Sequence, residues 1–85
     1  MSNAKEILKG IVDYLSGNDN ALFFSDPDWT PQVMGVSKGQ AIAIEVVVPG
    51  SVRPADRIRI QSDFARNGGL YIVARGVDDV REHEL

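Results

Sequence analysis

Glu45 is the residue of this 85-residue chain whose type and setting most clearly suggest chemistry. It is the single charged residue in the run Ala41 to Val48, which is otherwise apolar. A carboxylate in that setting can be an oxygen ligand for a hard divalent cation. It can equally be a buried charge that needs a partner, which Arg57 or another arginine could supply. The residue types alone leave both interpretations open.

Arginines concentrate in the segment that follows this run, at Arg53, Arg57, Arg59 and Arg66, and Arg75 comes shortly after. Such a segment could contact the phosphates of DNA, in which case Arg53, Arg57 and Arg59 would be the binding residues. A run of charges more often forms the solvated face of a helix. The formal net charge of the chain is -3, so any DNA-binding surface would have to be local.

Trp29 lies in a segment rich in Asp and Pro, close to Phe23 and Phe24. We expect at least one of the two phenylalanines in the core. For Trp29 we favour core packing as well. The alternative is an exposed tryptophan in a protein-binding surface, because Trp is enriched at interface hot spots.

Several other kinds of site are not indicated. The chain has no cysteine, which excludes disulfides and thiolate metal sites, and His83 has no second histidine at ligand spacing. No Walker-type loop or Ser/His/Asp set is present. No signal segment and no membrane span is recognisable, so we expect a cytoplasmic protein without a membrane partner. With 44% apolar residues, the chain is expected to fold as one domain over residues 1–85.

The spacing of apolar residues predicts the elements that must position these side chains. Residues 4–16 show helical spacing, with Asn3 as the N-terminal cap and Glu6 completing a capping-box-like pair. A second helix is predicted over residues 54–67, with Ile60, Phe64 and Ala65 buried and Ile58 partly buried.

Four strands are predicted as well, over residues 21–24, 32–36, 41–48 and 70–74. The third is apolar at nearly every position, which is typical of a central strand covered on both faces. A short last helix should begin near Asp78 and Asp79, where the helix dipole favours negative charge. This order of elements predicts an α/β domain with one mixed sheet flanked by helices.

A series of segments between residues 31 and 80 follows a recognisable pattern in order and spacing. They are Met34-Gly35-Val36-Ser37-Lys38-Gly39, Ala41-Ile42-Ala43-Ile44-Glu45-Val46, Pro49-Gly50, Asn67-Gly68-Gly69, Tyr71-Ile72-Val73-Ala74-Arg75 and Val77-Asp78-Asp79-Val80. Together they resemble the VRR-NUC family of the PD-(D/E)XK nuclease superfamily. The resemblance implies a restriction-endonuclease-like α-β-β-β-α-β core, and Mg- or Mn-dependent cleavage of branched or flapped DNA. It also makes a homodimer an expectation.

The family's metal chemistry rests on four positions, of which this chain keeps one. The family's Asp falls on Gln32, its Lys on Val47 and its supporting Gln on Arg57, whereas its Glu is retained as Glu45. Gln32 is neutral and Val47 has no polar side-chain atom. The charge of Arg57 would oppose a nearby cation. We therefore expect no cofactor, with Mg or Mn only if the family chemistry survives, and we interpret Glu45 as a paired, vestigial carboxylate.

The sequence thus favours a nuclease-fold domain that is inactive as a nuclease. One alternative is a protein-binding scaffold on the same fold, either naturally degenerate or redesigned, with Trp29 near its binding surface. The others are a residual metal-dependent endonuclease, and DNA binding without cleavage through the arginine-bearing helix.

Overall fold

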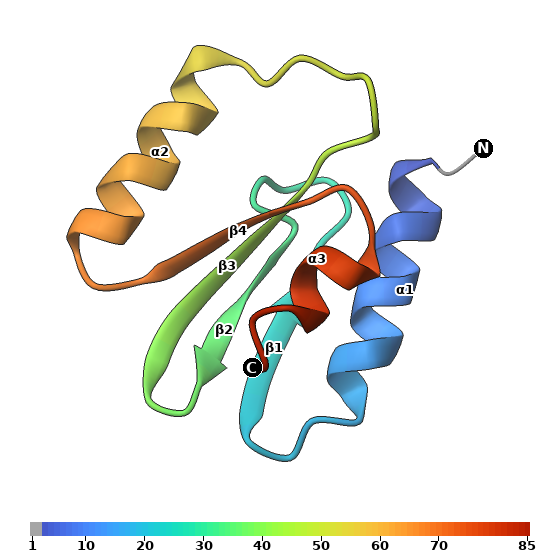
Figure 1. Ribbon diagram of the computed structural model, residues 1–85, viewed down its shortest axis with the longest axis vertical. Coiled ribbons are helices and arrows are strands. Elements are labelled where there is room, and N and C mark those ends of the chain that lie inside the picture. The colour runs from blue at the N-terminus through green and yellow to red at the C-terminus, as the bar shows by residue number, and fades with distance from the viewer. Residues whose placement is uncertain (1–2) are drawn as a thin grey trace.

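The computed structural model describes residues 3–85. Seven elements follow one another in the predicted order of helices and strands (Figure 1). They are α1 (Ala4–Ser16), β1 (Ala21–Ser25), β2 (Val33–Ser37), β3 (Gln40–Val46), α2 (Ala55–Arg66), β4 (Leu70–Ala74) and α3 (Val77–Arg81). The predicted elements are all present, and their ends differ from the sequence-based bounds by at most two residues.

The four strands form one mixed sheet in the order β1-β2-β3-β4. The first three are antiparallel neighbours, whereas β3 and β4 are parallel and are joined by the crossover through α2. Lys38 and Gly39 form the tight turn between β2 and β3, with φ angles of 52° and 81°. Positive φ at both central residues matches the twist of a two-residue hairpin. The predicted α/β class with a mixed sheet flanked by helices is confirmed.

The hydrophobic core lies between one face of this sheet and α1 with α3. Register aligns Val33, Ile44 and Ile72 across three strands, so their side chains share this face. The helix α1 contributes its buried residues Ile7, Ile11 and Leu15 to the same core, and α3 contributes Val80. As predicted, Asn3 caps α1, because its Oδ1 accepts a hydrogen bond of 2.9 Å from the Glu6 N–H.

The helix α2 lies on the opposite side of the sheet from α1 (Figure 1). It packs against β4, where the rings of Phe64 and Tyr71 meet edge to face at 6.0 Å. No residue of α2 is fully buried. The predictions that Ile60 and Ala65 are buried and that Ile58 is partly buried are wrong, since all three are exposed. The reason is that α2 covers only the β4 side of the sheet, so much of its apolar surface meets no other element.

The rest of that sheet face, over β1 and β2, presents apolar side chains to solvent. Register places Leu22 beside Val36 and Phe24 beside Met34 on one face. Their exposed fractions are 63% for Leu22, 50% for Val36, 68% for Phe24 and 41% for Met34. We call these four residues the open face.

The aromatic residues near β1 divide between the core and this surface. Phe23 is half-buried against the core, which confirms that one phenylalanine packs there. Trp29 is 65% exposed, so the prediction that it packs in the core is wrong. It belongs to the loop between β1 and β2, and it lines a shallow groove together with Phe24 and Met34. Trp29 therefore adjoins the open face.

Candidate functional site

Glu45 lies on the side of β3 that faces away from the α1 helix. Its neighbours Ile44 and Val46 point into the core, so strand alternation directs Glu45 to the other face of the sheet. The residue is nonetheless completely buried, with an exposed fraction of 0%. A carboxylate in such a position requires charged or hydrogen-bonding partners.

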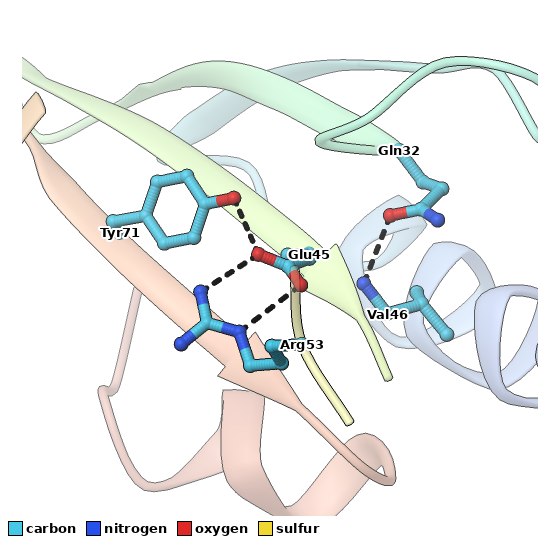
Figure 2. Close-up of polar contacts among 5 residues, drawn as sticks. All are labelled: Gln32, Glu45, Val46, Arg53 and Tyr71. Atoms are coloured by element: carbon cyan, nitrogen blue, oxygen red, sulfur yellow. Dashed lines mark hydrogen bonds and ion pairs between the residues drawn. The ribbon is translucent and has the colours of Figure 1, made fainter. Parts of the chain in front are cut away.

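Arg53 is the ionic partner of this carboxylate. Its Nη2 lies 2.8 Å from Glu45 Oε1, and its Nε lies 3.1 Å from Oε2, so both carboxylate oxygens are engaged (Figure 2). Arg53 comes from the segment of residues 47–54 that joins β3 to α2, and its side chain is only 15% exposed. This two-bond arrangement is the geometry in which a guanidinium binds a carboxylate most strongly.

Tyr71 provides the third bond to Glu45. Its hydroxyl donates to Oε1 over 2.7 Å from the parallel strand β4 (Figure 2). Tyr71 is buried, and its ring packs against Phe64 of α2. The three side chains therefore form a network, Glu45-Arg53-Tyr71, that joins β3, β4 and the segment before α2.

The surroundings keep Glu45 ionised. Burial by itself would raise the pKa of this carboxyl. The hydrogen bonds from Arg53 and Tyr71, together with the positive charges of Arg53 and Arg57, outweigh burial and hold the pKa below its ordinary value. Burial and the bond to Glu45 raise the pKa of Tyr71, so its hydroxyl remains protonated and continues to donate.

Gln32, which the resemblance aligns with the family's Asp, lies away from the Glu45 carboxylate (Figure 2). The side-chain Oε1 of Gln32 accepts a hydrogen bond of 2.9 Å from the backbone N–H of Val46 (Figure 2). Gln32 thus satisfies a strand backbone group near the end of β3.

Val47 and Arg57, which the resemblance aligns with the family's Lys and Gln, are also partly or fully buried. Val47 is buried at 6% exposure, and its backbone N–H donates to the Ala74 carbonyl over 2.9 Å. Arg57 is half-buried and acts on Glu45 only through its charge. The expectation that an arginine pairs with Glu45 is confirmed, and the arginine is Arg53 rather than Arg57.

These donors do not fit Mg or Mn. Within residues 3–85, no group of three or more His, Cys, Asp or Glu side chains is placed to hold a metal ion. Both oxygens of Glu45 are already bound to a cationic side chain. A cation at this position would have to displace Arg53 and would meet the charge of Arg57.

The arginines near α2 differ in their partners and in their burial. Arg53 is held by Glu45, and Arg66 of α2 forms an ion pair with Asp63 of the same helix. Arg59 is exposed, but α2 also carries Asp56. The residues predicted for DNA binding therefore have different surroundings: Arg53 mostly buried and paired, Arg57 half-buried, and Arg59 in solvent.

Two members of the network were not assigned to Glu45 from the sequence. Tyr71 was recognised only as a strand residue, and Arg53 only as one of several arginines. The parallel pairing aligns Tyr71 with Ala43, two residues before Glu45 on the same face, and this long-range register carries no local sequence signal. Comparisons with protein-family models, with curated proteins and with solved structures found no match. No helix within residues 3–85 has the length and apolar character needed to cross a bilayer.

Proposed function

We propose that this chain is a domain of the restriction-endonuclease-like, VRR-NUC-like fold that acts by binding protein and does not cleave DNA. The α-β-β-β-α-β order of the elements, with β3 and β4 parallel around a crossover helix, supports the fold assignment. The segment resemblance over residues 31–80 supports it independently. The residue types at the four family positions support the loss of catalysis.

The observation that carries the proposal is that the Glu45 carboxylate is buried and that both of its oxygens are bonded to side chains. In a metal-dependent nuclease, acidic oxygens must be available to hold a hard cation that activates water and neutralises charge on the phosphate. Here the single retained acid has no exposed surface, and Arg53 and Tyr71 occupy its oxygens. With Arg53 bound in place of a cation, the carboxylate leaves no position for a metal ion and its activated water.

The binding role rests on the open face. Soluble monomers seldom expose large contiguous apolar patches, and such patches commonly mark sites of protein interaction. In this chain Leu22, Phe24, Met34 and Val36 form one such patch, and Trp29 adjoins it. No charged side chain occupies the outward positions of β1 and β2 on this face.

The decisive experiment is a cleavage assay on flapped and branched DNA with added Mn²⁺. We expect no cleavage above the level of a Glu45→Ala variant. Calorimetric titration with Mn²⁺ should likewise give no binding that depends on Glu45. Robust Mn²⁺-dependent cleavage that disappears in Glu45→Ala would overturn the proposal, because it would require Arg53 to leave the carboxylate readily.

A further inference from the structure

We infer that the outer edge of β1 binds an extended peptide segment of another protein, which joins the sheet as a further strand. The segment carries apolar side chains at alternate positions and basic residues at its ends. The inference rests on the proposed function in one respect, namely that the domain acts by binding protein. It adds the place of binding and the chemistry of the partner. The carrying observation is that the outer backbone groups of β1 lie beside an apolar groove.

The backbone of β1 presents hydrogen-bonding groups on the side away from β2. Two pairs that continue the β1-β2 ladder are hydrogen-bonded: the Asp26 N–H donates to the Gln32 carbonyl over 2.8 Å, and the Lys38 N–H donates to the Asn20 carbonyl over 3.3 Å. Hydrogen-bonded and non-hydrogen-bonded pairs alternate along an antiparallel ladder. Every second residue of β1, beginning with Ala21, therefore turns its N–H and C=O outward. No hydrogen bond from elsewhere in residues 3–85 reaches these outward groups.

The edge of β1 lacks the features that prevent pairing with another chain. The strand reads Ala-Leu-Phe-Phe-Ser, without lysine, proline or a charged residue, and its register with β2 is continuous, without a bulge. Exposed edge strands normally carry such features to prevent uncontrolled pairing. A straight, uncharged edge of this kind is the surface to which extended peptides add as a strand.

An apolar groove of about 180 Å³ lies between β1 and the C-terminal half of α1. Its lining includes Val12 and Leu15 from the helix and Phe23 from the strand. A peptide residue opposite Phe23 would direct its side chain to the same face of the sheet, and so into this groove. On the other face, the added strand would lie beside Leu22 and Phe24 of the open face. The groove therefore selects apolar side chains at every second position of the peptide.

Charge complementarity specifies the ends of the peptide. Residues 10–37, which include the second half of α1 and all of β1, contain four aspartates and no lysine, arginine or histidine. Asp19 precedes β1, whereas Asp26 and Asp28 follow it, and all three are exposed. The nearest base, Lys38, donates to the Glu84 carbonyl over 2.9 Å. Acids thus stand at both ends of the edge, and they favour a partner with a basic residue at each end.

The first test uses the synthetic peptide Lys-Val-Thr-Val-Thr-Val-Lys as a probe of the whole protein. We expect a dissociation constant on the order of 100 µM, measured by titration in amide NMR spectra. The amide signals of Ala21, Phe23 and Ser25 should shift together and become protected from hydrogen exchange. The peptide Glu-Val-Thr-Val-Thr-Val-Glu should bind at least about 10-fold more weakly, because its ends repel the aspartates.

Ser25→Pro tests the backbone contact from the side of the protein. Ser25 is exposed and its N–H points outward, so proline removes an edge donor without removing a bond to β2. We expect the dissociation constant to rise by at least about 10-fold, since a partner carbonyl is left without a donor. The matched control is Ser25→Ala, which keeps the donor and should change the constant by less than about 2-fold.

Methylated peptides test the same contact when Ser25→Pro does not fold. Alternate amides of a strand point to opposite sides, and only one set can face β1. N-methylation of the valines or of the threonines should abolish binding in one case and leave it largely intact in the other. Equal effects of the two methylations would show that the peptide does not pair as a strand.

The other outcomes separate this inference from the proposed function. No shift of the Ala21 and Phe23 amides at about 1 mM of the lysine-ended peptide overturns the inference. It is equally overturned if these amides are already protected in the peptide-free protein, since another copy of the chain would then occupy the edge. Both results leave the absence of nuclease activity standing. Mn²⁺-dependent DNA cleavage would overturn the proposed function whether or not the peptide binds.

Discussion

Arg53 binds both oxygens of the Glu45 carboxylate, with Nη2 at 2.8 Å from Oε1 and Nε at 3.1 Å from Oε2. The pair joins β3 to the segment that leads into α2. A buried ion pair contributes little net stability compared with apolar residues of similar size, because both charges lose their hydration. Removing one partner alone is far more costly, since an uncompensated charge stays buried.

Arg53→Ala should therefore destabilise the protein strongly. We expect a loss of about 3–5 kcal/mol in the free energy of unfolding, measured by urea denaturation at neutral pH. The matched control is Arg66→Ala, which breaks the ion pair with Asp63 on the surface of α2, where the two side chains are 71% and 44% exposed. That control should cost less than about 1 kcal/mol. Equal effects for the two variants would contradict a buried, two-bond role for Arg53.

Tyr71→Phe should isolate the hydroxyl bond to Glu45. The ring packing against Phe64 is retained, and one donor to a charged acceptor is lost, which should cost about 1.5–3 kcal/mol. Tyr14→Phe is the control, because within residues 3–85 the Tyr14 hydroxyl makes no side-chain hydrogen bond and its ring faces the Arg81 guanidinium. We expect a change within about 0.5 kcal/mol for the control. If Tyr71→Phe were equally neutral, the 2.7 Å bond would have no energetic role.

The low pKa of Glu45 predicts a specific acid dependence of stability. The pKa of the folded state lies below the ordinary 4.5, so the unfolded chain binds the proton more readily. The stabilisation that the ionised Glu45 provides is complete above about pH 4.5, and it is lost as the pH falls through the folded-state pKa. Between pH 7 and pH 3, wild-type protein should lose more unfolding free energy than Glu45→Gln.

The control for this pH effect is Asp13→Asn, which removes an exposed carboxylate paired with Lys9. Between pH 7 and pH 3, this variant should lose about as much unfolding free energy as the wild type. An acid loss that is unchanged in Glu45→Gln would show that other carboxylates account for the whole effect.

Two glycines should respond to alanine in opposite directions. A Cβ at Gly35 would fall on the carbonyl oxygen of Leu22 and close to the Phe23 Cα, so β1 would have to move away from β2. We expect Gly35→Ala to cost about 1–3 kcal/mol. Gly10→Ala in α1 meets only Val77 Cβ at 4.0 Å, and should stabilise the protein by up to about 1 kcal/mol through helix propensity. Thermal unfolding of both variants checks the signs, and a neutral Gly35→Ala would contradict the close approach of the strands.

Much of the architecture could be predicted from local patterns. The spacing of Ile7, Ile11 and Leu15 correctly gave both the helix α1 and its buried face. The apolar run around Glu45 predicted a central strand. Because such a strand is buried, its carboxylate was expected to need a partner. These predictions succeed because helical and strand periodicities repeat over a few residues.

The sequence by itself therefore determined the element order and the core side of α1, and it favoured a pairing of Glu45 with an arginine over a metal site. Only the tertiary structure decided that the arginine is Arg53 and that Tyr71 completes the network, because strand register and the path of residues 47–54 bring them together. It also decided the exposure of Trp29 and Ile60. Burial depends on which other elements cover a side chain, and over β1 and β2 this chain provides no such element on the open face within residues 3–85.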